Sequence, residues 1–253
     1  MKDPTTRFSD RVDDYSNFRP NYPRQVLDYY KHQLGLAPDW KIADIGSGTG
    51  IFTQHFIANG NSVFGVEPNA KMREAAENAL ASDNFISIDG TEIDTGITDC
   101  SIDLIVAAQA FHWFDPHLFV SECLRIAKPH ACISLLWNER LVEIDSFHRQ
   151  YEDLIIKHAS DYLKIDHRKT GIQKLKKIQP IEDYQYFEVD NKQTLNFAGL
   201  KGRLLSSSYV PKGDDAVNMI DDLKTLFEKY HENGILDLKY KTKVYSIAIK
   251  DLK

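Results

Sequence analysis

Cysteine is scarce in this chain of 253 residues, and its spacing excludes some common roles. The three cysteines are Cys100, Cys123 and Cys132, and no two of them form a CxxC pair. An odd number of thiols without paired spacing is typical of a protein from a reducing compartment, not of a disulfide framework or a zinc site. We therefore expect no metal ion and a cytoplasmic location.

Long apolar runs and an excess of basic residues are missing as well. No stretch is apolar over the length needed to cross a bilayer, and residues 1–15 lack the apolar core of a secretory signal. Lysine and arginine number 31 against 37 aspartates and glutamates, which gives a formal net charge of -6. These features argue against a membrane partner and against a nucleic-acid partner.

The first half of the chain alternates between strand and helix patterns. The expected strands span residues 41–45, 62–66, 85–88, 102–107 and 131–137. The expected helices span residues 50–59, 70–81 and 116–127, after a first helix that begins at Pro23. Strands separated by segments of helix length are typical of a parallel sheet with helices on both faces. The predicted fold class is therefore α/β, with a Rossmann-like, mostly parallel sheet.

The second half has longer helical patterns and fewer strands. Helical spacing covers residues 142–163 and 214–232, and strand patterns cover residues 185–189 and 244–249. No linker rich in proline, glycine or serine separates this half, so we place its two strands at the edge of the same sheet, in a single domain. The expected parts of residues 1–253 are a cap segment (1–35), a cofactor-binding core (36–140) and helical insertions over the mouth of the site (141–184 and 194–235).

A glycine loop, DIGSGTG at residues 44–50, is the most specific motif. Glycines at a turn between strand and helix let a ligand approach the backbone closely. Ligands of open α/β sheets bind at the carboxyl ends of the strands, which is where this loop lies. Glu67 follows the second strand, where a carboxylate can accept hydrogen bonds from both hydroxyls of a ribose.

Two classes of ligand compete for such a loop, dinucleotides and S-adenosylmethionine. A dinucleotide fingerprint, GxGxxG, that starts at Gly46 would need glycine where the chain has Ile51. Asp44 beside the loop would repel a pyrophosphate, whereas it attracts the ammonium and sulfonium groups of S-adenosylmethionine. The pattern favours S-adenosylmethionine, with an NAD-type oxidoreductase on a similar sheet as the alternative.

With these residues in place, the sequence resembles the class I S-adenosylmethionine-dependent methyltransferases, in the small-molecule branch called methyltransferase type 11. The resemblance rests on Tyr15 and on the segments 18–23 (FRPNYP), 44–50, 66–68 (VEP), 90–92 (GTE), 103–114 (DLIVAAQAFHWF), 136–139 (LWNE) and 202–209 (GRLLSSSY). It implies a seven-stranded sheet with one antiparallel strand near its edge, which agrees with the seven strand patterns.

The resemblance also implies a set of cofactor-binding residues. The set is Arg19, Asp44, Gly46, Ser47, Gly48, Glu67, Pro68, Thr91, Glu92, Ala107 and Gln109. In it, Asp44 would hold the ammonium of S-adenosylmethionine, Glu67 the ribose hydroxyls and Arg19 the carboxylate. Thr91 and Glu92 would lie at the adenine edge, although many relatives have an acid where Thr91 stands.

Residues near the acceptor are assigned in the same way. Those expected to contact it are Tyr22, His112, Trp113 and Arg203. Ala107 and Gln109 would flank the methionine moiety, and Gln109 and His112 are the catalytic candidates, with His112 as a general base. The alternative for His112 is a loop histidine that packs beside Trp113.

Arg203 and the serines at 206–208 offer hydrogen-bond donors that suit an anionic or oxygen-rich substrate. Three consecutive serines also suit a polar turn with helix caps, so that alternative stays open.

The reaction expected from these residues is an in-line transfer of a methyl group from S-adenosylmethionine to an oxygen, nitrogen or carbon of a small molecule. A protein that binds the cofactor without catalysis is a second possibility, and a methyltransferase acting on RNA or protein is a third. We expect a monomer or a homodimer whose partner is the small-molecule acceptor.

Overall fold

The computed structural model describes residues 18–159, 162, 171–177, 183–207, 209–211 and 213–252. Several predictions concern residues outside this part of the chain. These are Tyr15 and the rest of residues 1–17 in the cap segment, Ser208, and residues 160–161, 163–170 and 178–182 in the first insertion.

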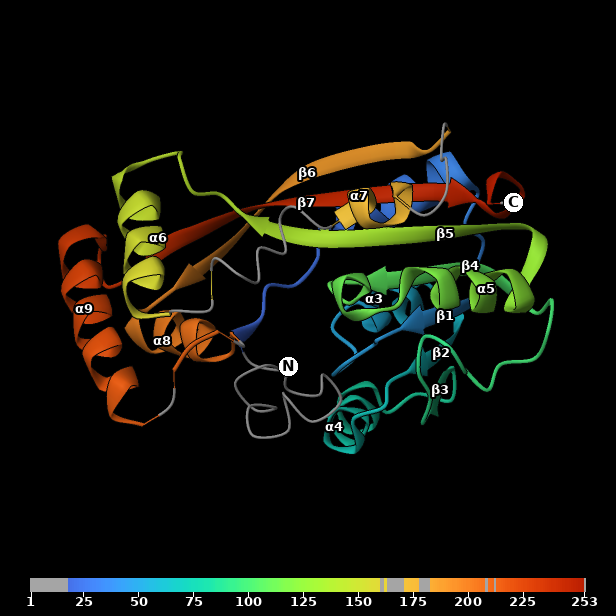
Figure 1. The fold of residues 1–253 in the computed structure, drawn as a ribbon, viewed down its shortest axis with the longest axis horizontal. Helices are drawn as coiled ribbons and strands as arrows, with labels where there is room; N and C mark the ends of the chain where they lie inside the picture. Colours follow the sequence, from blue (N-terminus) through green and yellow to red (C-terminus); the bar gives the residue numbers. More distant parts are fainter. Residues whose placement is uncertain are drawn as a thin grey trace.

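A seven-stranded sheet runs through the molecule in the order β3-β2-β1-β4-β5-β7-β6 (Figure 1). Its strands are β1 (Lys41–Ile45), β2 (Ser62–Val66), β3 (Phe85–Ile88), β4 (Ile102–Ala108), β5 (Ala127–Arg140), β6 (Gln185–Leu195) and β7 (Leu236–Ala248). The first five strands pair in parallel, and β7 is antiparallel to both β5 and β6. The predicted fold class is confirmed.

Helices follow most of the strands. They are α2 (Arg24–Tyr29) with its π-helical continuation η1 (Tyr30–Leu34), α3 (Thr53–Ala58), α4 (Ala70–Leu80), α5 (Pro116–Ile126), α6 (Ser146–His158), α7 (Gly171–Lys176), α8 (Phe197–Leu205) and α9 (Asp214–Tyr230). The short 3-10 helices are η2 (Phe111–Trp113) and η5 (Ile249–Asp251).

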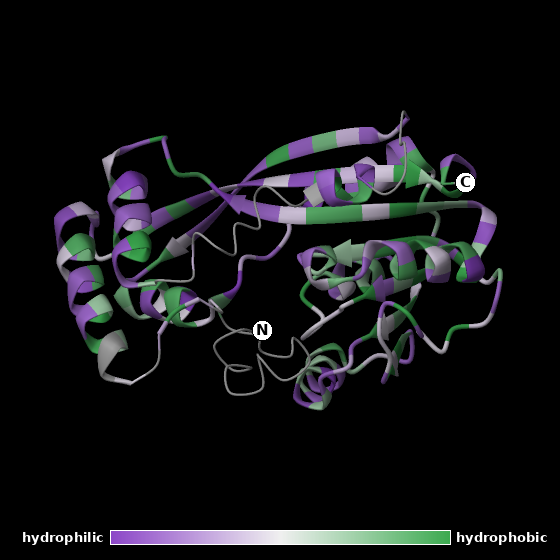
Figure 2. Ribbon diagram, in the orientation of Figure 1, coloured by the Kyte–Doolittle hydropathy of each residue, from purple (hydrophilic) through white to green (hydrophobic). Residues whose placement is uncertain are grey.

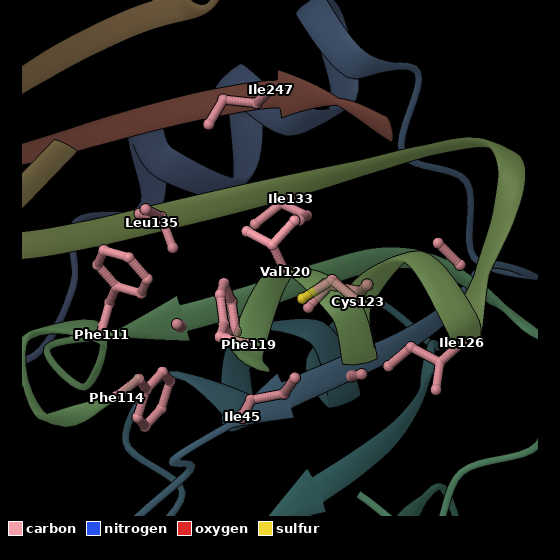
Figure 3. Packing of buried hydrophobic residues seen from close by; sticks show 14 of the residues in the cluster. Ile45, Phe111, Phe114, Phe119, Val120, Cys123, Ile126, Ile133, Leu135 and Ile247 are labelled. Carbon is pink, nitrogen blue, oxygen red and sulfur yellow. The ribbon is translucent and has the colours of Figure 1, made fainter. Parts of the chain in front are cut away.

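The central strands are buried on both faces, which explains their continuous apolar patterns. Alternate residues point to opposite faces, so Ile42 packs against Tyr30 and Phe56 while Ile45 belongs to the cluster around Phe119. Figure 3 shows the second cluster, in which Phe119 and its neighbours on α5 face the sheet. These two cores fix the position of the loop that follows β1.

The three strands at the other edge are longer than the sequence patterns predict, and the predicted ranges 131–137, 185–189 and 244–249 were too short. The outer half of β7 alternates between apolar and polar residues, whereas the outer ends of β5 and β6 are mostly polar, as Figure 2 shows. In β7, buried Leu238 and Tyr240 flank Lys239. This alternation is typical of a strand that is buried on one face only. β4, by contrast, is buried on both faces and has a long apolar run.

The extended ends of these strands carry a third apolar core. Tyr151 of α6, Leu204 of α8, Phe227 of α9 and Tyr240 of β7 all lie in it. Figure 1 shows α6, α8 and α9 together at this end of the molecule. The structure therefore holds the C-terminal helices on long strands, and their role as a substrate cover stays a prediction.

None of the helices in the described ranges is long and apolar enough to cross a membrane. The same residues contain no group of three or more His, Cys, Asp and Glu side chains placed to hold a metal ion. All three cysteines are free thiols, with Cys123 buried and Cys100 exposed.

A buried carboxylate ties α5 to the segment between β3 and β4. Glu122 accepts hydrogen bonds from the backbone N–H of Thr95 at 2.8 Å and from its hydroxyl at 2.5 Å. Arg125 donates to both oxygens of Glu122, at 2.6 and 2.8 Å. Burial by itself raises the pKa of Glu122, but the bonds from Arg125 and Thr95 outweigh it and lower the pKa to about 2.

We expect Glu122→Gln to lower the free energy of unfolding by about 1–3 kcal/mol at neutral pH, because the amide cannot accept all these bonds. A lowered carboxyl pKa contributes stability that is present above about pH 4.5 and is lost as the pH falls toward about pH 2. The difference between variant and wild type should therefore shrink between about pH 7 and about pH 3.5 in urea unfolding. A difference that is constant with pH, or one matched by the exposed Glu74→Gln control, would contradict this account.

Candidate functional site

The glycine loop begins where β1 ends, and its backbone requires glycine at several positions. Gly46, Gly48 and Gly50 have φ values of +73°, +57° and +79°, which side chains rarely adopt. A Cβ atom at Gly46 would also lie 2.6 Å from the Cβ atom of Ala110. The loop therefore has left-handed backbone conformations and packs tightly against the core on one side. On its other side the backbone of Gly46 lines the pocket described below.

Asp44, the last but one residue of β1, is buried beside this loop with an unsatisfied oxygen. Its Oδ2 accepts a hydrogen bond from the Thr53 hydroxyl at 2.7 Å, whereas its Oδ1 is buried without a hydrogen-bond partner among the described residues. Burial raises the pKa of Asp44 to about 7, the Thr53 bond opposes that rise, and the nearby charge of Glu67 adds to it. Such a carboxylate is suited to a cationic ligand.

Glu67 lies just past the end of β2 and holds the loop from the other side. It accepts hydrogen bonds from the backbone N–H of Gly48 at 3.1 Å and of Asn69 at 2.9 Å. Burial raises the pKa of Glu67, and these two bonds and Arg73 oppose the rise in part. Oε2 accepts the bond from Gly48 and Oε1 the bond from Asn69, so each oxygen retains acceptor capacity for a ligand hydroxyl.

A pocket opens between the glycine loop, the end of β4 and α8. Seven residues predicted from the sequence line it: Arg19, Tyr22, Asp44, Gly46, Ser47, Gln109 and Arg203. Six further residues line it that sequence reasoning missed: Pro20, Thr49, Ile51, Phe52, Ala108 and Asn138. Pro20 and Asn138 lie in the FRPNYP and LWNE segments, so the signal for them was present in the motifs themselves.

Gln109 has a strained backbone at the end of β4. Its φ is +58°, although it is not glycine, and its N–H donates to the carbonyl of Leu136 at 2.8 Å. Its side-chain Oε1 accepts from the backbone N–H of Asn138 at 2.9 Å. Non-glycine residues in this conformation are concentrated at functional sites, and here the strain turns the side chain of Gln109 onto β5 beside the pocket.

The segment that precedes α2 crosses the mouth of the pocket. Arg19 donates from Nη2 to the carbonyl of Ser206 at 2.8 Å, and Asn138 donates to the carbonyl of Pro20 at 3.3 Å. Tyr22 packs against Phe52 with ring centroids 4.6 Å apart. Residues from the start of the chain, the core and α8 thereby meet at one site.

Some predicted residues lie elsewhere. Ala107 is fully buried and its side chain belongs to the core, so the neighbouring Ala108 faces the pocket in its place. The reason is strand geometry, because successive side chains point to opposite faces. Thr91 donates its N–H to the carbonyl of Asp94, and Glu92 accepts from the N–H of Asp115 at 3.3 Å, beyond the wall of the pocket.

His112 and Trp113 form the short helix η2 beyond β4, with ring centroids 5.0 Å apart. Lys174 of α7 donates to the carbonyl of His112 at 3.3 Å and also to that of Phe114. Neither His112 nor Trp113 is among the described residues that line the pocket. A catalytic role for His112 therefore stays a prediction. Gly48 lies between the lining residues Ser47 and Thr49 but is not one of them, and Glu67 and Pro68 are not lining residues either.

Comparison with known proteins adds an independent result. Residues 43–135 match the family model described as "Methyltransferase domain". An uncharacterized methyltransferase of Mycobacterium tuberculosis is 31% identical over 139 residues, 55% of each chain. An uncharacterized methyltransferase-like protein of Schizosaccharomyces pombe is 30% identical over 137 residues, 53% of this chain and 52% of its own. These matches span about half the length of the relatives.

Solved structures share the fold over most of the chain. A protein from Anaeromyxobacter dehalogenans, assigned as a type II methyltransferase, has a TM-score of 0.69 at 21% identity, covering 92% of this chain and 98% of its own. A phosphoethanolamine N-methyltransferase 2 from Haemonchus contortus, in complex with phosphomonomethylethanolamine and S-adenosylhomocysteine, has a TM-score of 0.54 at 13% identity, covering 94% of this chain and 56% of its own. At these identities the likeness shows the fold.

The raised pKa of Asp44 has a consequence for stability. The folded value of about 7 lies above the ordinary value of 3.8, so the unfolded chain loses this proton first as the pH rises. The folded state is then progressively destabilised between about pH 4 and about pH 7, and the full penalty applies above that window.

We expect Asp44→Asn to raise the free energy of unfolding of the ligand-free protein, because the amide removes the buried charge. The gain should be larger at about pH 8.5 than at about pH 5.5 by about 1 kcal/mol or more. Urea unfolding at the two pH values measures it, with the exposed Asp83→Asn as the matched control. A gain that does not grow with pH would mean that Asp44 is not the buried, unpaired carboxylate described above.

Proposed function

We propose that this chain is a class I S-adenosylmethionine-dependent methyltransferase that binds its cofactor at the glycine loop and methylates a small molecule. The observation that carries the proposal is the buried Asp44 beside the glycine loop, with one oxygen that has no partner among the described residues. A ligand with positively charged groups would offset the unfavourable free energy of this buried carboxylate. S-adenosylmethionine has two such groups, an ammonium and a sulfonium.

The other residues of the site fit the same ligand. Gly46 lines the pocket with its backbone, because the position that a Cβ atom would take there lies against Ala110 and Phe114 on the core side. Glu67 has acceptor capacity for the ribose hydroxyls, and Arg19 offers a planar fork for the carboxylate. These three contacts would orient the cofactor along the carboxyl edge of the sheet.

Catalysis in such a site rests mainly on positioning. Bound S-adenosylmethionine supplies an already activated methyl group, so the chain's own residues have to align the acceptor and exclude water. Gln109 and Asn138 are locked to each other beside the pocket, and residues 18–22 close its mouth. The acceptor would be held on the side of α8, opposite the glycine loop.

The same features argue against the two rival functions. A dinucleotide would bring a pyrophosphate next to the Asp44 carboxylate, and Ile51 stands where the fingerprint requires glycine. A binding protein without catalysis would have no need for a pocket that continues from the loop to Arg203. The acceptor is a small molecule in this proposal because the pocket is enclosed by Arg19, Tyr22 and α8.

Calorimetric titration with S-adenosylmethionine and S-adenosylhomocysteine tests the cofactor site. We expect binding to the wild type that weakens by about tenfold or more in Asp44→Asn and in Glu67→Gln. In the wild type the affinity should rise between about pH 6 and about pH 8, because the cation binds the ionised form of Asp44, whose pKa is about 7. Asp44→Asn should lose this pH dependence.

Two controls make that experiment decisive. Asp83→Asn should bind like the wild type, and NAD should give no heat in any variant. Binding of NAD in preference to the sulfur compounds would refute the proposed function. Equal affinities in the wild type and Asp44→Asn would refute the role of the buried carboxylate.

A further inference from the structure

Arg140 and Arg203 come from separate elements, and their surroundings bring them together. Arg140 is the last residue of β5 and pairs in register with Tyr240 of β7. Arg203 of α8 donates from Nε to the hydroxyl of the same Tyr240 at 3.0 Å. Both guanidinium groups also act on Tyr151 of α6. Burial raises the pKa of Tyr151, and the two positive charges oppose that rise in part. The two cations therefore share one region between β5, β7 and α6.

Arg140 is only partly compensated in this region. Its side chain is 10% exposed, Glu152 forms an ion pair with its Nη2, and the guanidinium lies 4.9 Å from the centroid of the Tyr151 ring. Its Nη1 is buried without a hydrogen-bond partner among the described residues. Burying a donor of a charged group without a partner is unfavourable, so this nitrogen is suited to donate to an acceptor.

Arg203 has neutral hydrogen-bond partners only. Besides Tyr240, its Nη1 donates to the hydroxyl of Ser207 at 2.9 Å and to that of Ser206 at 3.4 Å. No carboxylate contacts it within the described residues. Arg203 nevertheless lines the pocket that contains Gln109 and Asn138. A cation held in place by neutral groups at the wall of a pocket is suited to a ligand of negative charge.

The charges in this part of the molecule do not balance. Arg140 and Arg203 together carry two positive charges, and the carboxylate that pairs with them in the described residues is that of Glu152. Tyr151 beside them is neutral near pH 7, because burial raises its pKa well above the ordinary value. One positive charge is left for a ligand.

We propose that Arg203, supported by Arg140, forms a subsite for an oxyanion of the methyl acceptor, so that the substrate is a small acid with a carboxylate or phosphate group. This inference rests on the proposed function, since it assigns the acceptor side of the same pocket. Arg203 presents a planar fork that matches both kinds of oxyanion, and the hydroxyls of Ser207 and Tyr240 keep it oriented. The anion would be fixed at α8 and the rest of the acceptor would face the glycine loop.

The cofactor also has a carboxylate, and Arg19 belongs to the segment, residues 18–22, that crosses the mouth of the pocket. Arg19 and Arg203 both contact Ser206, through its carbonyl and its hydroxyl respectively, so they stand side by side without sharing an acceptor atom. Two arginines allow two anions, one from the cofactor at Arg19 and one from the acceptor at Arg203.

Anion titrations into protein saturated with S-adenosylhomocysteine test the subsite. The probes are succinate, inorganic phosphate and, as a neutral control of the same shape, succinamide. We expect succinate or phosphate to bind the wild type, Arg203→Met to weaken that binding by about tenfold or more, and Arg203→Lys to restore part of it. A preference for succinate assigns a carboxylate and a preference for phosphate assigns a phosphate. Succinamide should not bind.

Arg149→Met is the matched control, because Arg149 is an exposed arginine on α6, and it should bind the anions like the wild type. S-adenosylhomocysteine should bind Arg203→Met within about threefold of the wild type, which shows an intact fold and cofactor site. A large loss of that affinity would assign Arg203 to the cofactor carboxylate and overturn the proposal. Anion binding that is absent, or equal in Arg203→Met and the wild type, would overturn it too.

The same anions are titrated without S-adenosylhomocysteine. If the wild type binds the anions through Arg203 but does not bind S-adenosylhomocysteine, the proposed function fails and the anion subsite stands. If it binds S-adenosylhomocysteine and neither anion, the proposed function stands and the subsite fails.

Discussion

The site depends on one buried carboxylate that the folded chain does not compensate by itself. Asp44 is enclosed at the end of a central strand, accepts one hydrogen bond from Thr53 and forms no ion pair within the described residues. Glu67 lies close enough to raise its pKa further. Two acids beside one loop destabilise the ligand-free protein, and the proposed ligand would offset that cost by bringing positive charge and hydroxyl groups to them.

The surrounding structure stabilises this unfavourable arrangement. The cores on both faces of the sheet fix β1 and β4, and between them the chain tolerates a left-handed Gln109 and a loop that admits no Cβ atom at Gly46. Each of these features lowers stability locally. A protein that binds its ligand through strained or uncompensated groups gains stability when these groups are replaced, and loses function by the same change.

The sequence predicted the parallel half of the fold well, because β1 and β4 are buried on both faces and appear as continuous apolar runs. It failed for the outer halves of β5 and β7, because residues 138–140 of β5 are all polar and the alternation Leu238, Lys239, Tyr240 of β7 is shared with loops and surface helices. In the site, the glycine loop identified Asp44 and Glu67, because spacing and charge are local properties. Contacts across the sheet, such as the hydrogen bond from Asn138 to Gln109, depend on register and are not visible in a single sequence.

The boundary of the family match separates the two halves of the pocket. The matched residues 43–135 include Asp44, Glu67 and Gln109, and they end before Asn138, Arg140 and Arg203. Asp44 and Glu67, proposed for the ammonium and the ribose of the cofactor, thus belong to the shared domain, whereas Arg19 precedes it and the residues proposed for the acceptor stand on the long strands and helices beyond it. A fold keeps one chemistry while its attached elements choose the substrate, so differences in acceptor among related proteins should be sought at positions such as Arg140 and Arg203.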